Sequence, residues 1–173
     1  RLAMERPGDA VLSEEATRDE HADLSRLDAP RVWIIDPVDG TREYGEGRAD
    51  WAVHVALVED HVPTAGAVAL PGLSLVLGTD DPPTLVAPAN PPRIVVSRTR
   101  PPVEARHIAD ALGADLIGMG SAGAKAMAVV RGEAELYVHS GGQYEWDSCA
   151  PVAVALAAGL WCSLKTRLGE LEK

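Results

Sequence analysis

The chain has 173 residues, enough for a single domain, with 16 Lys and Arg against 26 Asp and Glu and a formal net charge of −10. This balance argues against non-specific binding to nucleic acid or to an anionic membrane surface. It does not exclude a small anionic substrate, because bound metal ions reverse the local charge of a site. No apolar run approaches the length of a membrane span. The two cysteines, Cys149 and Cys162, do not indicate a disulfide scaffold, so a reducing, cytoplasmic setting is expected.

The first predicted elements are two strands separated by a charged segment. Residues 10–13 are predicted to form a short strand, and residues 32–35 form an apolar run typical of a strand buried on both faces. Residues 16–30 are charged and lack apolar periodicity, so a mobile surface loop is expected there. His21 lies in this loop and is expected to be solvated.

Three further strands are expected before the middle of the chain. Residues 51–59 alternate with both faces mostly apolar, which predicts an interior strand in which His54 is a hydrogen-bonded strand residue rather than a ligand. Residues 63–70 and 73–79 supply two more strands, and the tight turn between them argues for antiparallel pairing. The proline-rich residues 80–92 are expected to form an irregular crossover loop.

The second half alternates strands with helices, which is typical of a sheet with helices on its faces. The predicted strands are residues 94–97, 115–118 and 134–139. The predicted helices are residues 102–112, 121–131 and 147–158, with Asp147 at the N-cap of the last. The chain is expected to act as one functional unit, divided into a first sheet (1–92), a second α/β half (93–164) and an unaligned tail (165–173).

Two carboxylates, Asp36 and Asp39, follow the predicted strand at residues 32–35. Pro37 is expected to end that strand, because proline has no N–H to donate to the ladder. Acids three residues apart beyond a rigid proline can face one point, where they would raise each other's pKa by repulsion. A hard divalent cation removes that cost, and oxygen-only ligands favour Mg²⁺, Mn²⁺ or Ca²⁺ over Zn²⁺.

The next two residues are suited to holding an anion. Gly40 permits a sharp turn or a close approach of the backbone to a ligand. Thr41 is expected to cap a helix whose first N–H groups could hold a phosphate oxygen. The pattern therefore predicts a metal and phosphate site at a strand end. A solvated Asp-Gly turn is the alternative that these residues alone leave open.

Three separate motifs resemble the signatures of the inositol monophosphatase superfamily, which comprises Mg²⁺-dependent, Li⁺-inhibited phosphatases. The first is Asp36-Pro37-Val38-Asp39-Gly40-Thr41. The second is Trp146-Asp147, followed by small residues at the start of a helix. The third is the pair Glu14-Glu15 at the end of an earlier strand. The motifs occur in the order that the family has, and the resemblance covers roughly residues 1–162.

The resemblance implies a layered α/β (α+β) fold, the α-β-α-β-α sandwich of sugar phosphatases and inositol monophosphatases. Its first sheet would be mostly antiparallel and its second sheet smaller. Members of the family also have a helical hairpin before the Glu-Glu strand and further elements after the Trp-Asp helix. This chain is expected to lack those N- and C-terminal parts.

Further details resemble the CysQ-type 3′(2′),5′-bisphosphate nucleotidases within the superfamily. Arg42-Glu43-Tyr44 matches their basic, acidic and aromatic residues after the first signature, and residues 95–98 resemble their substrate-side strand. Lys125 matches a lysine of their Gly-Ser helix, which could hold the second phosphate of the nucleotide as a point charge. A solvated helix lysine is the alternative. The other candidates for substrate contact are Ser97, Arg98, Arg100 and Ser121, and the residue that stacks on the base is left open among Tyr44, Tyr144 and Trp146.

The resemblance implies a ligand set for the metal ions. Glu14 and Asp36 would bind one ion, helped by the backbone carbonyl of Val38. Asp36 would bridge to a second ion held by Asp39 and Asp147. Two or three Mg²⁺ ions are implied, with Mn²⁺ as a substitute and Li⁺ as an inhibitor.

Roles in catalysis follow from the same resemblance. Gly40 and Thr41 would hold the scissile phosphate through backbone N–H groups, and the hydroxyl of Thr41 would help to orient the attacking water. The implied catalytic residues are Glu14, Asp36, Thr41 and Asp147.

The activity implied by the resemblance is hydrolysis of the 3′-phosphate of 3′-phosphoadenosine 5′-phosphate, or of its sulfated form, during sulfate assimilation. The expected partners are a small phosphorylated substrate and a second copy of the chain in a homodimer, without nucleic acid or membrane. One alternative is an inositol 1-phosphatase or sugar phosphatase of the same superfamily. The other is a truncated, non-catalytic protein that retains metal binding.

Overall fold

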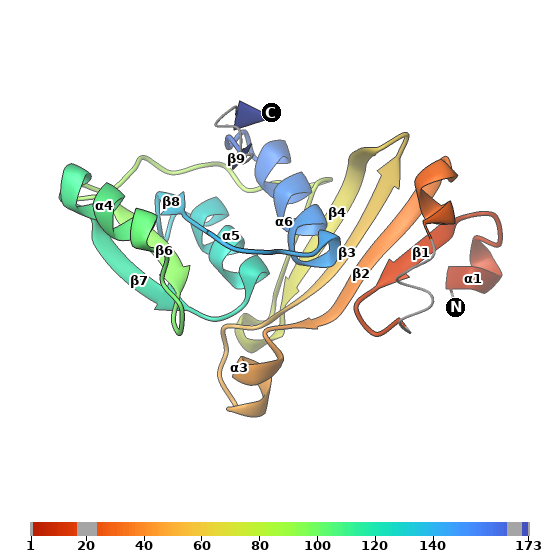
Figure 1. The fold of residues 1–173 in the computed structure, drawn as a ribbon, viewed down its shortest axis with the longest axis horizontal. Coiled ribbons are helices and arrows are strands. Elements are labelled where there is room, and N and C mark those ends of the chain that lie inside the picture. The colour runs from red at the N-terminus through yellow and green to blue at the C-terminus, as the bar shows by residue number, and fades with distance from the viewer. Residues whose placement is uncertain (1, 17–23, 166–170, 173) are drawn as a thin grey trace.

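The computed structural model describes residues 2–16, 24–165 and 171–172 of the chain. Within these residues the elements form layers, with a helix outside a small sheet and a pair of helices between the small sheet and a large one (Figure 1). The predicted layered α/β class, with a larger and a smaller sheet, is therefore confirmed.

The large sheet contains five strands in the order β1-β2-β3-β4-β5. These strands are β1 (Ala10–Ser13), β2 (Arg31–Asp39), β3 (Ala52–Glu59), β4 (Val62–Leu70) and β5 (Leu75–Gly78). β1 pairs parallel with β2, whereas β2, β3, β4 and β5 pair antiparallel in sequence. The prediction of a mostly antiparallel first sheet is confirmed. Short connections join β3 to β4 and β4 to β5, as antiparallel neighbours allow.

Short helical segments accompany this sheet. They are α1 (Leu2–Glu5) before β1, η1 (Ser25–Asp28) before β2, α3 (Thr41–Gly45) after β2, and η2 (Pro71–Leu73) between β4 and β5. η1 lies in the segment, residues 16–30, that was expected to be a mobile surface loop. His21 of that segment lies outside the described residues.

The small sheet has the order β7-β6-β8, and both of its pairs are parallel. Its strands are β6 (Arg93–Ser97), β7 (Asp115–Met119) and β8 (Leu136–Tyr137). The main helices are α4 (Val103–Leu112), α5 (Ala122–Val130) and α6 (Glu145–Ala157), and β9 (Leu164–Lys165) pairs antiparallel with β10 (Leu171–Glu172). β8 is shorter than predicted, because only two of its residues pair in register with β6. In the described part of the chain, no helix is long and apolar enough to cross a membrane.

Helices α5 and α6 lie between the two sheets and cover the inner face of the large one (Figure 1). β3 turns every second residue inward, so Ala52, His54 and Ala56 are buried. Small residues allow close packing of α6 on β4, since a Cβ at Gly66 would lie 2.9 Å from Cβ of Ala153. The ends of these strands and helices are therefore anchored in a well-packed core.

The crossover at residues 80–92 contains no helix or strand. Hydrogen bonds to Glu135 connect this crossover to the small sheet. The Glu135 carboxylate accepts hydrogen bonds from the backbone N–H groups of Ala89 at 3.0 Å and Arg93 at 2.5 Å. It also accepts one from Nη2 of Arg93 at 2.8 Å. The Arg93 side chain, followed by these N–H groups, lowers the pKa of Glu135 to about 2 despite partial burial.

We expect Glu135→Gln to lower the melting temperature by about 2–6 °C near neutral pH, because two backbone N–H groups and Arg93 lose a charged acceptor. The folded pKa lies below the model-peptide value, so the stabilisation is present above pH 4.5 and is lost as the pH falls toward about 2. Thermal denaturation across this range should therefore show a flatter pH dependence for the variant. The control is Glu133→Gln, which removes a surface pair with Arg131 and should change the melting temperature by about 1 °C or less.

Candidate active site

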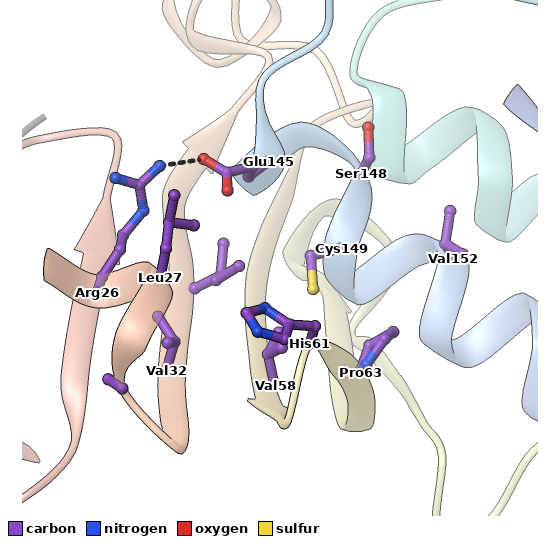
Figure 2. Close-up of a pocket in the computed structure, with 12 residues that line it drawn as sticks. Arg26, Leu27, Val32, Val58, His61, Pro63, Glu145, Ser148, Cys149 and Val152 are labelled. Atoms are coloured by element: carbon purple, nitrogen blue, oxygen red, sulfur yellow. Dashed lines mark hydrogen bonds and ion pairs between the residues drawn. The ribbon is translucent and has the colours of Figure 1, made fainter. Parts of the chain in front are cut away.

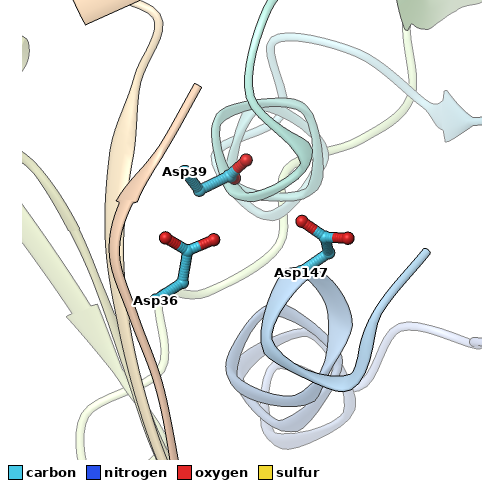
Figure 3. A group of neighbouring side chains, drawn as sticks. All are labelled: Asp36, Asp39 and Asp147. Carbon is cyan, nitrogen blue, oxygen red and sulfur yellow. The ribbon is translucent and has the colours of Figure 1, made fainter. Parts of the chain in front are cut away.

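Three carboxylates meet beside the inner face of the large sheet. Asp36 and Asp39 come from β2 and Asp147 from the first turn of α6, and their side chains point toward one another (Figure 3). One carboxylate oxygen from each lies within 4.8 Å of the other two. Asp36 is only 1 % exposed and Asp39 only 7 %, so a concentrated negative charge is held largely out of water.

An irregularity in β2 turns both aspartates to the same side of the sheet. Side chains alternate along a strand, so residues three positions apart ordinarily face opposite sides. Here Asp36 pairs with His54 of β3 but Asp39 pairs with Ala52, so three steps along β2 match two along β3. The prediction that Pro37 ends the strand is wrong, because Pro37 lies at this bulge, where its missing N–H breaks no regular ladder bond.

Asp147 is held in place by the backbone at the start of α6. The prediction that it is the N-cap is wrong, because Tyr144 is the N-cap and Asp147 is the third residue of the helix. Its Oδ2 accepts a hydrogen bond from the Tyr144 N–H at 2.8 Å, as in a capping box. Trp146 packs into the core beneath β1 and β2, and the ring of Tyr144 stacks on it with centroids 4.6 Å apart.

The electrostatics of the three carboxylates suit a cation. Burial, followed by the neighbouring carboxyls of Glu14 and Asp39, raises the pKa of Asp36 to about 8. Burial also raises the pKa of Asp147. A nearby positive charge reverses such shifts, and an all-oxygen donor set matches the preference of hard divalent ions. The residues present therefore fit Mg²⁺ or a similar ion.

Asp39 is stabilised as an anion by the start of α5. Burial acts to raise its pKa, but His54, Ser121 and the N–H of Gly123 together outweigh burial and lower the pKa. Its Oδ2 accepts hydrogen bonds from Oγ of Ser121 at 2.5 Å and from the Gly123 N–H at 2.7 Å. Because the first N–H groups of a helix lack intrahelical acceptors, a carboxylate is favoured there. Asp39 thus ties the large sheet to α5.

His54 supports Asp39 from within β3. Its Nδ1 donates a hydrogen bond to the Trp146 carbonyl at 2.9 Å, and its Nε2 lies 3.2 Å from Oδ2 of Asp39. Burial lowers the pKa of His54, but Asp39 more than offsets this and the pKa is raised. A Cβ at Gly123 would collide with Nε2, so the helix approaches the ring only because this residue is glycine. The prediction of a hydrogen-bonded strand histidine is confirmed.

Glu14 lies beside Asp36 because β1 runs parallel to β2 and its last residue, Ser13, pairs with Ile35. Its N–H donates to the Ile35 carbonyl at 3.2 Å, which continues the ladder past the end of β1. Its side chain is a hydrogen-bonding neighbour of the Asp36 carboxyl. Glu14 therefore borders the three-carboxylate group, although it does not belong to the set of three that converge most closely.

The turn after β2 differs from the prediction in its cap. Gly40, with φ 90°, is the N-cap of α3, and Thr41 is the first residue of the helix rather than its cap. The hydroxyl of Thr41 instead donates a hydrogen bond to the Val38 carbonyl at 3.2 Å. A Cβ at Gly40 would lie 3.1 Å from Cβ of Ser121. The positive φ and this close approach together account for a glycine here.

A cavity of about 320 Å³ opens next to the carboxylates. Its wall is built largely from residues that follow the carboxyl ends of the parallel strands β6, β7 and β8, where ligands commonly bind in α/β proteins. The sequence interpretation named several of its lining residues, namely Asp39, Gly40, Thr41, Ser97, Arg98, Ser121, Lys125 and Asp147. It did not name Tyr137, His139 or Gln143, although their position in the last part of the strand predicted at residues 134–139, or just after it, was an available signal.

Two predicted phosphate contacts have other partners in the structure. Arg98 donates through Nη2 to Glu43 at 2.8 Å and to Glu46 at 2.9 Å. Lys125 is 4 % exposed, and its Nζ donates to the carbonyls of Gly120 and Ser121. The alternative of a solvated helix lysine is therefore wrong, and burial lowers the pKa of Lys125.

A second cavity, of about 350 Å³, lies on the other side of the start of α6 (Figure 2). Its floor is apolar, with Val32 from β2 and Val58 from β3. Its rim carries Arg26, which is paired with Glu145 at 2.8 Å. The Sγ of Cys149 also borders it (Figure 2), and burial raises the pKa of that thiol to about 11. This cavity has no convergent charge for a phosphate ester, so the carboxylate cavity is the candidate site.

We expect Cys149→Ala to leave any phosphatase activity within about twofold of wild type, because Cys149 borders the second cavity and no mechanism in the first cavity needs it. Raising the pKa from 9.0 to about 11 lowers the thiolate fraction about a hundredfold at neutral pH. Alkylation by iodoacetamide, followed by mass spectrometry of the native protein, should therefore be slow at Cys149. Rapid alkylation with loss of turnover would instead indicate a nucleophile.

Comparison with known proteins places this site in a family. The sequence matches the inositol monophosphatase family over residues 1–81 and 85–168. A 3′-phosphoadenosine 5′-phosphate phosphatase of Mycobacterium bovis is 53 % identical over 94 % of this chain and 63 % of its own. A 3′(2′),5′-bisphosphate nucleotidase CysQ of Salmonella typhimurium is 31 % identical over 88 % of this chain and 65 % of its own. The crystal structure of CysQ from Bacteroides thetaiotaomicron has a TM-score of 0.75 at 28 % identity, covering 91 % of this chain and 69 % of that one.

The chain thus spans a little under two thirds of these curated relatives. Within that span, the family match includes β1, β2 and α6, which supply Glu14, Asp36, Asp39 and Asp147. The agreement of sequence match, fold and carboxylate geometry leads to one assignment. The chain belongs to the inositol monophosphatase family, whose members are metal-dependent phosphatases.

Proposed function

We propose that this chain carries the active site of a Mg²⁺-dependent phosphomonoesterase acting on 3′-phosphoadenosine 5′-phosphate, which would yield AMP and phosphate. The observation that carries the proposal is the three-carboxylate group of Asp36, Asp39 and Asp147. Two of its members, Asp39 and Asp147, line a cavity whose other wall bears cationic side chains. The names of the relatives at 31–53 % identity support the choice of substrate. A role in sulfate assimilation, a cytoplasmic location, a homodimer and action on the sulfated nucleotide belong to the same proposal.

The metal ligands would be Asp36, Asp39 and Asp147, with Glu14 and the carbonyl of Val38 completing the sites. Bound Mg²⁺, in two or three sites, would supply positive charge to the phosphoryl oxygens and lower the pKa of a water molecule. Mn²⁺ would substitute for Mg²⁺, and Li⁺ would inhibit. The ligands are held by β2 and α6, elements anchored in the core, so their spacing is set before an ion binds.

The residues after β2 would orient the scissile phosphate. Gly40 turns the chain so that the first N–H groups of α3, which have no intrahelical acceptors, can face a phosphoryl oxygen. The hydroxyl of Thr41 donates a hydrogen bond to the Val38 carbonyl, so its lone pairs can accept a hydrogen bond from the attacking water and orient it. Positioning and charge stabilisation are the main requirements of phosphoryl transfer, so no side-chain nucleophile is needed.

The far wall of the cavity supplies candidates for the second phosphate of the nucleotide. Lys125 lies there with its Nζ 5.3 Å from the centroid of the Tyr137 ring, and two of its three N–H donors are used by backbone carbonyls. Arg100 also lines the cavity and, within the described ranges, has no carboxylate partner at ion-pair distance. Ser97 and Ser121 complete this wall. We assign the second phosphate to Lys125 and Arg100.

Lys125→Ala tests the choice of substrate. We expect kcat/KM for the bisphosphate nucleotide to fall about 10–100-fold, because a charged hydrogen bond to the second phosphate is lost. The value for inositol 1-phosphate should fall less than about threefold. Arg131→Ala, which removes a cation just after the C-terminal end of the same helix, is the control and should leave both values unchanged. Equal losses on both substrates would favour inositol or sugar phosphates over the nucleotide.

A further inference from the structure

Glu43 is a buried carboxylate that the roles above do not use. It lies in α3 and is 6 % exposed, so its charge requires a partner. That partner is Arg98, which follows β6 in the other half of the fold, with 2.8 Å between Nη2 and Oε1. Glu46 also contacts Arg98, at 2.9 Å, but its side chain is 45 % exposed. Arg98 therefore joins the second half of the molecule to two carboxylates of the first half next to the cavity, and of these two only Glu43 is buried.

The stem of Glu43 also shapes the turn that leads into α5. A Cβ at Gly120 would collide with Cγ and Cδ of Glu43, and a Cβ at Gly40 would lie 3.4 Å from its Oε2. Glu43 thus occupies the space between the turn after β2 and the turn after β7. Asp50 also fixes the turn after β7, because its Oδ2 accepts a hydrogen bond from the Gly120 N–H at 2.7 Å.

The position of Gly120 determines the far wall of the cavity. The next residue, Ser121, donates to Asp39 and caps α5 by accepting the Ala124 N–H at 2.9 Å. The carbonyls of Gly120 and Ser121 hold the ammonium of Lys125. A shift of this turn would therefore move the cation assigned to the second phosphate relative to the carboxylates.

We infer that Glu43 and Arg98 are a pair of positioning residues, which set the far wall of the cavity at the distance that a substrate with two phosphates requires. The inference rests on the proposed function and replaces the predicted role of Arg98 as a phosphate ligand. The Nη2 of Arg98 donates hydrogen bonds to the carboxylates of Glu43 and Glu46. Its backbone N–H donates to the Met119 carbonyl at 2.9 Å. The pair acts on substrates that reach Lys125, and has little effect on those bound only at the carboxylates.

The test compares Glu43→Gln and Arg98→Met with two controls in steady-state assays. We expect both variants to raise KM for 3′-phosphoadenosine 5′-phosphate about tenfold, with kcat/KM for inositol 1-phosphate changed less than about threefold. Mg²⁺ affinity, measured by calorimetry, should stay within about twofold. Glu46→Gln removes only the exposed contact of Arg98 and should behave as wild type. Arg98→Lys keeps a cation within reach of Glu43, so its KM for 3′-phosphoadenosine 5′-phosphate should be much closer to that of wild type than the KM of Arg98→Met is.

A second measurement separates positioning from direct contact and does not depend on turnover. The amide resonances of Gly120 and Ser121 in ¹H–¹⁵N spectra without substrate should shift in Glu43→Gln and Arg98→Met but not in Glu46→Gln. Unchanged resonances with a raised KM would overturn the inference, as would equal losses on both substrates or a parallel loss of Mg²⁺ affinity. If the methionine variant does not fold, Glu43→Gln and Arg98→Lys still decide the result. A wild-type chain that releases no phosphate would count against the proposed function, whereas the resonance shifts alone would still test the pair.

Discussion

Replacing Asp147 with asparagine is expected to reduce phosphate release at least about a hundredfold, while the chain remains folded. The substitution removes one of the three carboxylates that converge at the proposed metal site, and metal ligands in phosphatases of this kind contribute several kcal/mol to stabilising the transition state. An asparagine oxygen can still accept the Tyr144 N–H, so the first turn of α6 keeps its capping bond. The melting temperature in EDTA should change by no more than about 2 °C. The measurements are phosphate release, calorimetric titration with Mg²⁺ and thermal denaturation.

The matched control for this variant is Glu145→Gln. Glu145 lies in the same first turn of α6 and carries the same charge, but its carboxylate points away from the metal site to pair with Arg26. Removing it should leave turnover and Mg²⁺ affinity within about twofold of wild type. If Asp147→Asn kept wild-type turnover at the same Mg²⁺ concentration, the assignment of the three carboxylates as the active site would be wrong.

Replacing Asp36 with asparagine is expected to abolish Mg²⁺-dependent turnover and also to stabilise the metal-free chain. Asp36 is 1 % exposed, and burial together with Glu14 and Asp39 raises its pKa to about 8. Because this folded-state pKa lies above the ordinary aspartate value of 3.8, the folded chain binds the proton more tightly than the unfolded chain does. The free energy of unfolding contributed by Asp36 therefore falls as the pH rises from about 4 to about 8.

Asparagine at position 36 removes this pH-dependent cost and can still accept the Val38 N–H. In EDTA at pH 8, the melting temperature should rise by about 2–8 °C, which corresponds to about 1–2 kcal/mol in a chain of this size. Saturating Mg²⁺ should stabilise wild type by about 2–3 kcal/mol at a hundred times its Kd, and the variant by much less. Differential scanning calorimetry with and without Mg²⁺ measures both effects. Asp115→Asn, an exposed site on β7, is the control.

A variant that is less stable than wild type in EDTA and still gains stability from Mg²⁺ would contradict this account. That result would mean that Asp36 is held mainly by its hydrogen bond to Val38 rather than strained by neighbouring carboxylates. The increase in stability on removing a charge is the more diagnostic result, since most substitutions at buried positions destabilise a protein.

Much of the fold could be predicted from local pattern. Alternation over residues 51–59 identified β3, in which buried residues of the inner face alternate with half-buried residues of the other face. The order of strands and helices after residue 93 indicated a sheet with helices on its faces, since parallel strands require crossover connections. The predicted helix boundaries were less accurate where a hydrogen bond to a side chain caps the first turn of a helix. The Tyr144 N–H donates a hydrogen bond to Asp147, and the N-cap of α6 is Tyr144, three residues before the predicted N-cap.

Other features depend on contacts between segments far apart in the chain. The bulge at Pro37 requires the register of β3, which no property of β2 alone reveals. The burial of Glu43 and its pairing with Arg98, 55 residues away, require both halves of the fold. Sequence reasoning therefore named the acidic motif residues and proposed Arg98 as a phosphate contact, but it did not foresee the pairing of Arg98 with Glu43. A basic side chain near an acidic site can contact a carboxylate or a phosphate, and only the folded chain shows which carboxylates lie within its reach.

The most direct test of the central claim is phosphate release by this chain from 3′-phosphoadenosine 5′-phosphate and from inositol 1-phosphate, measured in parallel with Mg²⁺ and with added Li⁺. We predict release from the nucleotide that requires Mg²⁺, is inhibited by Li⁺ and has a kcat/KM at least about tenfold above that for inositol 1-phosphate. A preference for inositol 1-phosphate would contradict the assigned substrate. Binding of Mg²⁺ without release from either compound would contradict the assigned activity and would indicate a metal-binding protein that is not catalytic.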